Sequence, residues 1–362
     1  MDTILLHNTE KDIARAGEIL RGGGLVAIPT ETVYGLAANA LDGAAVARIF
    51  QAKGRPQDNP LIVHISHIDQ WEKLVRDIPE NAKALAEAYW PGPLTIILPK
   101  SDIIPVEVSA GLDTVAVRFP SMRATRRIID AAGVPLAAPS ANLSGSPSPT
   151  CARHTMDDMR GRIDAVLDGG ECNFGVESTV VTLATPVPRL LRPGAVTPEE
   201  LREVLGELEI DDAVMGQLKE GVKAASPGMK YKHYSPKAEI TIVKGSLEAF
   251  IQYAGRAGER GRTNEAVFAL CFDGEQSAIP LDCVTYGRSD DAFTQSHRLF
   301  TALRELDEKG AAKVLARCPS TEGVGMAVYN RLLRAAGFSV VDAENTSIQC
   351  ASRDYPSDED IQ

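Results

Sequence analysis

Strand-like and helix-like segments alternate along this chain, and this alternation limits the possible folds more than any other feature of the sequence. Leu25–Ile28 is a short apolar run that ends at a proline, whereas Ala44–Lys53 carries apolar residues at helical spacing. Gly54 follows that segment and is typical of a helix C-terminus. Alternating strands and helices predict an α/β fold.

Further segments of both kinds follow. The other strands expected in the first half are Leu61–Ile65, Leu94–Leu98, Val115–Phe119, Pro135–Ala138, Ala165–Leu167, Ser178–Leu183 and Arg189–Leu191. In the second half we expect strands at Ile240–Val243, Ala266–Phe272 and Lys313–Ala316. Helices are expected from Ser121 to Ala132, from a Thr197 cap onward, and over Asp291–Lys309 and Gly325–Ala336.

The 362 residues are enough for two domains of roughly 150 residues each. A hydrophobic content of 44% excludes a disordered chain. The periodic pattern fades after residue 205 and restarts at Glu239. We therefore expect a first domain over residues 1–205, a linker over 206–238, a second, smaller α/β domain over 239–350 and an acidic tail over 351–362.

The net charge is −11, and both halves of the chain are acidic. A protein that mainly grips a nucleic-acid backbone usually shows a basic excess, so this class is disfavoured, while a local basic pocket for a small anion stays open. Gly221–Ala238 in the linker departs from the trend, with four lysines and no acidic residue. We expect this segment to act as a lid near bound negative charge; a merely soluble tether is the alternative.

The six cysteines are scattered, with no CxxC pair and no zinc-type spacing of Cys and His. Scattered thiols in a long chain are typical of a reducing compartment. The N-terminus lacks the apolar core of a signal peptide, and no apolar run approaches the ~18 residues of a membrane span. We therefore expect a cytoplasmic protein without a protein-bound metal. The P-loop and the GxSxG elbow are also absent from the sequence.

Polar residues gather where the expected strands end, which is where open α/β sheets bind ligands. Pro29–Leu36 places two threonines and a glutamate after one strand, and Ala137–Ser148 is an uncharged, small-residue loop after another. Small residues let backbone N–H groups approach a phosphate. Glu177–Val180 and Leu191–Gly194 bracket two neighbouring strands. A polar turn and a flexible surface loop are the alternatives for the first two segments.

Three cations stand out beside these loops. Lys53 and Arg55 flank a glycine at a helix end and can converge on one anion, unless they only form a cationic helix cap. Arg118 shares a strand face with Thr114 by the period of two. An arginine within an apolar strand needs an anionic partner, which is either a bound carboxylate or an internal salt bridge.

In this order the segments resemble the L-threonylcarbamoyladenylate synthases in their long, two-domain form. The resemblance rests on Pro29–Leu36, Lys53–Arg55, Asn59–His64, Asp113–Arg118, Ser140–Asn142, Glu177–Val180, Arg192–Gly194 and Lys230–Pro236. It spans essentially the whole chain. Ser235 stands where alanine is common, and Asn330 where aspartate is frequent, and neither departure touches the implied chemistry.

The resemblance implies a reaction of L-threonine, bicarbonate and ATP that yields L-threonylcarbamoyl-AMP and pyrophosphate. The product would pass to the tRNA threonylcarbamoyl transferase machinery for N6-threonylcarbamoyladenosine modification, with no membrane partner and no strong nucleic-acid contact. Mg²⁺ would be held mainly by the ATP phosphates. The implied fold is a twisted mixed open sheet around a concave pocket, followed by a smaller Rossmann-like α/β domain.

The resemblance also assigns residues to roles. L-threonine would bind at Thr32, His64, Arg118, Ala138 and Ser178. ATP would bind at Arg55, Asn59, Thr114, Ser140, Ser148, Arg192 and Tyr234. The catalytic residues would be Lys53, Arg55, Ser140 and Asn142, with Lys53 and Asn142 facing the phosphates or bicarbonate.

Two other classes stay open. An RNA-binding module is one, because a concave fold of this kind can suit RNA, although the acidic first half argues against it. A carbamoyl-transfer domain of the hydrogenase-maturation type is the other, because it shares the catalytic fold. Such domains occur in larger chains with zinc-finger segments, and this sequence has no CxxC pair.

Overall fold

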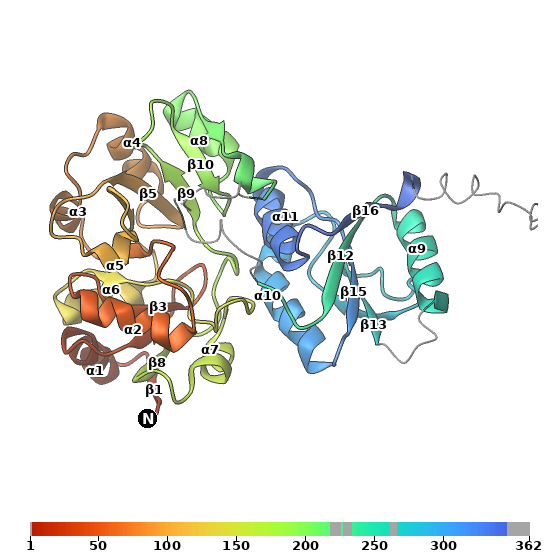
Figure 1. The fold of residues 1–362 in the computed structure, drawn as a ribbon, viewed down its shortest axis with the longest axis horizontal. Helices are drawn as coiled ribbons and strands as arrows, with labels where there is room; N and C mark the ends of the chain where they lie inside the picture. The colour runs from red at the N-terminus through yellow and green to blue at the C-terminus, as the bar shows by residue number, and fades with distance from the viewer. Residues whose placement is uncertain (1, 218–225, 227–233, 261–265, 346–362) are drawn as a thin grey trace, which may run out of the picture.

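The computed structural model describes residues 2–217, 226, 234–260 and 266–345 and forms two α/β units (Figure 1). The first contains an 11-stranded sheet with the order β1-β8-β2-β3-β7-β4-β6-β5-β9-β10-β11. Its strands are β1 Ile4–His7, β2 Val26–Ile28, β3 Gly35–Asn39, β4 Ile62–His64, β5 Leu94–Pro99, β6 Thr114–Arg118, β7 Leu136–Ala137, β8 Ala165–Asp168, β9 Thr179–Thr182, β10 Arg189–Arg192 and β11 Glu209–Ile210. Parallel and antiparallel pairs mix, which confirms the expected mixed sheet.

Helices cover both faces of this sheet. They are α1 Glu10–Arg21, α2 Gly43–Lys53, α3 Asp69–Leu74, α4 Glu80–Tyr89, α5 Val106–Ser109, α6 Arg123–Ala132, α7 Ala152–Met159 and α8 Pro198–Leu205, and a short 3₁₀ turn follows at Asp212–Val214. Helices α1 and α6 bury Leu20 and Ile128 together in one core. A larger core that includes Ile49 of α2 and Leu85 of α4 fills the other side.

The second unit is a five-stranded, fully parallel sheet with the order β14-β13-β15-β12-β16. Its elements are β12 Glu239–Lys244, α9 Leu247–Arg260, β13 Val267–Cys271, β14 Asp282–Thr285, α10 Ala292–Glu308, β15 Lys313–Arg317, α11 Gly323–Ala335 and β16 Val340–Asp342. Helix α9 covers one face, while α10 and α11 cover the face toward the first unit (Figure 1). The predicted α/β class is therefore confirmed for both units.

Local sequence signals set the helix ends that matter for the site. Asp42 caps α2 by accepting from Ala44 N and Ala45 N, and Gly54 ends the helix with φ 62°. This left-handed conformation favours glycine, and it turns the chain sharply between Lys53 and Arg55. The capping box expected at Thr197 is present, because the Thr197 and Glu200 side chains accept from each other's backbone N–H.

The segment expected to be a linker begins as part of the first sheet. Strand β11 pairs in parallel with β10, and Ala213 packs with residues of β9 and β10. Ser226 and residues from Tyr234 onward are also described, whereas the rest of the lysine-rich segment lies outside the described residues. The division of the chain at residues 205 and 238 stays a prediction.

The two units share an apolar interface reinforced by ion pairs. Val33 and Val176 of the first unit belong to the same buried cluster as the α10 and α11 core. Arg304 Nη2 of α10 lies 2.8 Å from Asp158 Oδ2. A second and more deeply buried ion pair joins α11 to the first unit and is described below.

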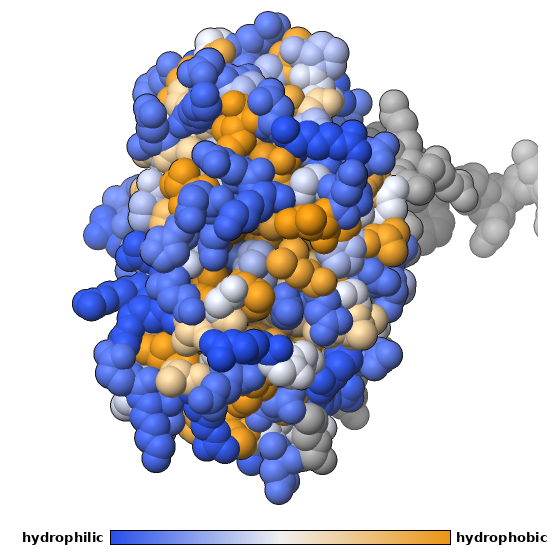
Figure 2. Space-filling view, turned by 90° about the vertical axis from the view of Figure 1, so that its left-hand side faces the viewer, coloured by the Kyte–Doolittle hydropathy of each residue, from blue (hydrophilic) through white to orange (hydrophobic). Residues whose placement is uncertain are grey.

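The face of the first unit turned away from the second is mostly hydrophilic, with scattered apolar patches (Figure 2). Among the residues that the structure describes, no helix is both long enough and apolar enough to cross a membrane.

Candidate active site

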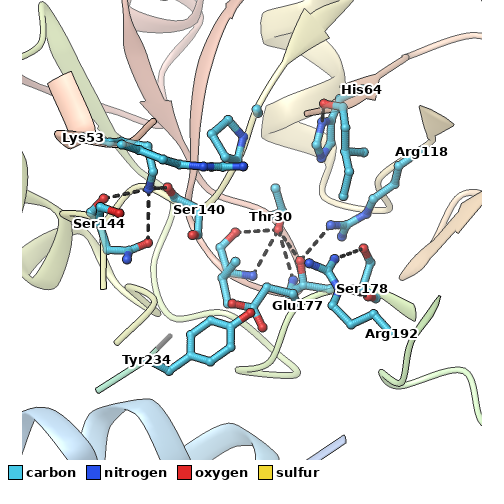
Figure 3. A pocket seen from close by; sticks show the side chains of 18 of the residues that line it. Thr30, Lys53, His64, Arg118, Ser140, Ser144, Glu177, Ser178, Arg192 and Tyr234 are labelled. Atoms are coloured by element: carbon cyan, nitrogen blue, oxygen red, sulfur yellow. Dashed lines mark hydrogen bonds between the residues drawn. The ribbon is translucent and has the colours of Figure 1, made fainter. Parts of the chain in front are cut away.

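A cavity opens where several strands of the first sheet end (Figure 3). Strands β4 and β6 are parallel, and their register pairs His64 with Arg118 at the carboxyl ends. Strands β9 and β10 are antiparallel, so Arg192 at the end of β10 lies beside Ser178, which precedes β9. The sheet topology thus brings polar residues from distant parts of the chain to one edge.

The cavity unites most of the residues that the sequence singled out. Its lining includes Thr32, Lys53, Arg55, His64, Arg118, Ala138, Ser140, Asn142, Ser178, Arg192 and Tyr234. All of these residues except Ala138 come from the segments that carry the family resemblance, including the linker end at Tyr234. Their assigned roles toward threonine and ATP stay predictions.

Three of the expected site residues do not line the cavity. Ser148 is fully buried behind it and donates from Oγ to Glu177 Oε1 at 2.5 Å. Asn59 is also buried, and its backbone oxygen accepts from Arg55 Nη2 at 3.0 Å. Thr114 starts β6 opposite Pro99, at the other end of the strand from Arg118. Ser148 and Asn59 therefore contact the site through Glu177 and Arg55.

Sequence reasoning assigned no role to three polar residues that line the cavity, namely Thr30, Ser144 and Glu177. Thr30 donates from Oγ1 to the Val33 backbone oxygen at 2.6 Å, and its hydroxyl lies 2.8 Å from that of Thr32. Glu177 is buried and holds Ser148. Thr30 and Glu177 lie within segments that carry the resemblance, so their position beside Thr32 and Ser178 was the available signal, whereas Ser144 lies outside those segments.

Arg118 has an internal anionic partner. Its Nη2 lies 2.6 Å from Glu31 Oε1, its Nη1 donates to Thr32 Oγ1 at 2.8 Å, and both charged side chains are only 4% exposed. Burial alone would raise the pKa of Glu31, but the Arg118 charge and the hydrogen bonds lower it below its usual value. The internal salt bridge weighed from sequence is thus present. Arg118 Nε is buried without a protein hydrogen-bond partner.

Lys53, the last residue of α2, forms hydrogen bonds with the small-residue loop Ala137–Ser148. Its Nζ donates to the backbone oxygens of Ser140 and of Asn142, the latter at 2.7 Å, and lies 3.4 Å from Asn142 Oδ1. Burial, with a smaller contribution from the Arg55 charge, lowers the pKa of Lys53 to about 7. All of these partners are neutral oxygens, so no carboxylate compensates the Lys53 charge directly.

The other basic groups of the lining are also shifted by burial. Desolvation lowers the pKa of Arg55 to about 10 and that of Arg192 to about 10. Arg192 donates from Nε and Nη2 to the backbone oxygen and Oγ of Ser178 at 3.0 and 3.1 Å. Burial and the Arg118 charge lower the pKa of His64 to about 3, so His64 is neutral near pH 7.

The charge balance of the cavity favours anionic ligands. Its lining contains four basic side chains, from Lys53, Arg55, Arg118 and Arg192, but a single carboxylate, from Glu177. This local excess of positive charge lies inside a protein of net charge −11. An anion in the cavity would recover part of the desolvation free energy of these cations.

The described residues do not fit a metal held by protein ligands. They contain no group of three or more His, Cys, Asp or Glu side chains placed to hold an ion. The Glu177 carboxylate is already shared between Ser148 and an arginine. We therefore derive no step through Mg²⁺, and its expected attachment to ATP phosphates stays a prediction.

Comparisons with known proteins show the family of this chain. The family model Sua5_yciO_yrdC, described as telomere recombination, matches residues 18–194. A second model, described as threonylcarbamoyl-AMP synthase, C-terminal domain, matches residues 196–337. The threonylcarbamoyl-AMP synthase of Pyrococcus abyssi is 43% identical over 347 residues, which cover 94% of this chain and 99% of that protein. The Bacillus subtilis protein of the same name is 44% identical, with coverage of 93% and 96%.

A solved structure extends the match to three dimensions. The Pyrococcus abyssi Sua5 structure complexed with L-threonine has a TM-score of 0.88 and 43% identity, over 94% of this chain and 99% of that chain. Two α/β units, with a cationic cavity in the first, together with these relatives define an enzyme of the nucleotidyltransferase type. The chain belongs to the threonylcarbamoyl-AMP synthase family, which confirms the resemblance seen in the sequence.

Proposed function

We propose that this enzyme joins L-threonine, bicarbonate and ATP into L-threonylcarbamoyl-AMP and releases pyrophosphate. The observation that carries the proposal is the buried cationic cavity, with four basic side chains and one carboxylate, in a member of this family. All three substrates carry negative charge, so bringing them together requires positioning and charge neutralisation.

The chemistry balances without a protein nucleophile. The threonine amine attacks the carbon derived from bicarbonate, and a carbamate forms with loss of water. A carbamate oxygen then attacks the α-phosphorus of ATP, the bond from that phosphorus to the bridging oxygen of the β-phosphate breaks, and pyrophosphate leaves. What the protein must supply is a set of fixed positive charges and hydrogen-bond donors around two anions.

We assign threonine to the part of the cavity around Arg118, Thr32 and Ser178. The support is the buried guanidinium of Arg118, whose Nε has no protein partner, and the hydroxyls beside it. Glu31 would then orient Arg118, and the threonine carboxylate would bind the same guanidinium beside it. Neutral His64 lies in register with Arg118 and adds no charge near the amine. Ala138 offers only its backbone and space.

We assign ATP to the part lined by the loop after β7 and the end of α2. Lys53 and Arg55 lie there with neutral oxygen partners, so their charges are available to phosphates. Ser140 and Asn142 come from the loop that Lys53 braces. Arg192 and Tyr234 complete the lining, and we expect Tyr234 to pack against the nucleotide. Asn59, Thr114 and Ser148 would act from outside the lining.

The product would be consumed by a transferase that modifies adenosine in tRNA, as the family resemblance implies. An acyl adenylate is labile to water, so a site that buries its residues this deeply also suits protection of the product.

The test is pyrophosphate release with each substrate omitted in turn. We expect release to require ATP, L-threonine and bicarbonate together, and to proceed without tRNA. Mass spectrometry should show an AMP-linked product whose mass includes threonine and one carboxyl group from ¹³C-bicarbonate. Equal pyrophosphate release without threonine would refute the proposal.

A further inference from the structure

Arg331 is fully buried, yet it comes from α11 of the second unit and reaches the wall of the cavity in the first. Its Nε donates to Glu177 Oε2 at 2.9 Å, and its Nη2 to the Glu177 backbone oxygen at 3.1 Å. Its Nη1 donates to the Pro193 backbone oxygen at 2.6 Å and to Asn330 Oδ1 at 3.2 Å. One guanidinium therefore holds two separate segments of the first unit.

These two segments carry cavity residues. Glu177 directly precedes Ser178, and Pro193 directly follows Arg192, which itself donates twice to Ser178. The segments also approach closely, because a Cβ on Gly194 would lie 2.3 Å from Thr179 N. Arg331 thus holds together the two segments that carry Ser178 and Arg192, which we call the Ser178–Arg192 corner of the cavity.

Glu177 links Arg331 to a third segment. Its Oε1 accepts from Ser148 Oγ at 2.5 Å while its Oε2 accepts from Arg331. Burial alone would raise the pKa of Glu177, but the Arg331 and Arg192 charges and these hydrogen bonds lower it. Without Arg331 the carboxylate would lose its ion-pair partner inside a cavity built for anions.

We propose that Arg331 is a positioning residue through which the second unit shapes the substrate cavity. It keeps Glu177 ionised and fixed, and through Glu177 it orients the Ser148 hydroxyl and the Ser178–Arg192 corner. The inference rests on the proposed function for the identity of the ligands, but the arrangement itself does not depend on it. The second unit is accordingly part of the binding machinery rather than an appended domain.

The alternative is that Arg331 only fastens the two units together. Arg331→Met removes the charge and keeps much of the side-chain volume, and Glu177→Gln removes the carboxylate that needs it. Arg317→Met is the matched control, because Arg317 forms a partly buried ion pair with Glu275 and its hydrogen-bond partners lie within the second unit. The full chain is used throughout.

Calorimetric titration with ATP and with threonine gives the first readout. We expect R331M to bind at least one of them about tenfold or more weakly, while R317M binds both like the wild type. The double variant R331M/E177Q should recover part of the loss, because a neutral amide needs no cation, while the contacts of Arg331 with the Glu177 and Pro193 backbone oxygens stay absent. Equal losses in R331M and R317M, or no recovery in the double variant, would overturn the inference.

The pH dependence of ATP binding gives a second readout that simple fastening would not change. In R331M the pKa of Glu177 should rise, so the carboxyl is neutral at low pH and becomes an unpaired buried anion as the pH increases. Binding by R331M should therefore weaken with rising pH more steeply than in the wild type, and E177Q in the double variant should remove the difference. Parallel wild-type and R331M profiles would count against the inference.

These binding assays also separate the inference from the proposed function. If wild-type enzyme binds ATP but releases no pyrophosphate with threonine and bicarbonate, the proposed reaction fails while the Arg331 effect can still be measured. Should R331M not fold, R331M/E177Q and R331K carry the same comparison, since neither leaves a buried carboxylate without a partner.

Discussion

Replacing Arg118 and Glu31 together separates substrate binding from fold stability at the proposed threonine subsite. The two side chains are each 4% exposed and lie 2.6 Å apart. Removing one partner of such a buried pair costs ~3–5 kcal/mol of folding free energy, because the other charge stays buried and unpaired. R118M alone would therefore lose threonine affinity even if Arg118 had only a structural role.

The double variant E31Q/R118M removes that ambiguity. A glutamine oxygen can still accept from the backbone N–H groups of Ser121 and Met122, which now bind Glu31 Oε2. Replacing both charges in a buried pair is often close to neutral for stability, so we expect the double variant to regain most of what R118M loses. It has no cation for the threonine carboxylate, and losing a desolvated charge pair costs ~2–5 kcal/mol of binding, or roughly 30-fold to several thousand-fold in affinity.

Stability and binding can be measured independently in this protein. Trp71 and Trp90 are the chain's two tryptophans, and both are buried in the first unit, so their fluorescence during urea unfolding reports on the domain that carries Arg118. Calorimetry gives the affinities for threonine and ATP, and ATP affinity should change less. A folded E31Q/R118M protein that binds threonine like the wild type would show that Arg118 is structural and would remove it from the proposed subsite.

Three further predictions follow from the cations and the domain interface. K53M and R55M should each lower the rate of pyrophosphate release by ~10²–10³ while threonine affinity changes little; near-normal rates would return both residues to the role of a helix cap. The pKa of Lys53 is about 7, and nearby phosphates would raise it, so the enzyme should take up a proton when it binds ATP at about pH 8. The measured binding enthalpy of the wild type should therefore depend on the ionisation enthalpy of the buffer, and that of K53M should depend on it much less. A chain ending at residue 217 exposes Val33 and Val176 and leaves Glu177 without Arg331, so its threonine-dependent pyrophosphate release should fall roughly tenfold or more; full activity would contradict the inferred role of the second unit.

The sequence predicted much of this fold because its strongest signals are local. Leu94–Leu98 and Arg189–Leu191 are short apolar runs, and they appear as β5 and β10 within a residue at each end. The capping box that begins at Thr197 is encoded within four consecutive residues, which end at Glu200. The site could be predicted for the same reason, because polar residues that directly follow strands of an open sheet converge at one edge.

Elements with weak local patterns were missed. The strand β1 has four residues with a mixed burial pattern, and it is stabilised by pairing with β8, far along the chain. Strand β11 has two residues and depends on β10. Such short strands owe their existence to a partner, and periodicity within the segment cannot reveal that partner.

Contacts between charged residues that lie far apart along the chain could not be predicted from the sequence either. The sequence indicates that Arg118 needs an anion, but only the three-dimensional arrangement shows that Glu31 is that anion. The structure also shows that the buried Nε–H of Arg118 has no protein hydrogen-bond partner. Arg331 lies on a helix whose sequence looks like an ordinary amphipathic segment, and its pairing with Glu177 depends on how the two units dock. Ser148 was expected to contact ATP, yet its hydroxyl is committed to that same glutamate.

The partners of the buried cations distinguish the two ends of the cavity. Lys53 has only neutral oxygens as hydrogen-bond acceptors, and burial lowers its pKa to about 7 although the Asp158 and Glu177 charges act in the opposite direction. Burial also lowers the pKa of Arg55 to about 10, and the Asp58 charge offsets only part of this shift. Arg118, in contrast, is already neutralised by Glu31. A multiply charged phosphate chain gains most where positive charge is uncompensated, whereas a single carboxylate can be shared with an arginine that keeps its internal partner. The electrostatics therefore favour phosphates beside Lys53 and Arg55 and threonine beside Arg118, and the reverse arrangement would crowd a polyanion against Glu31 and leave Lys53 without compensation.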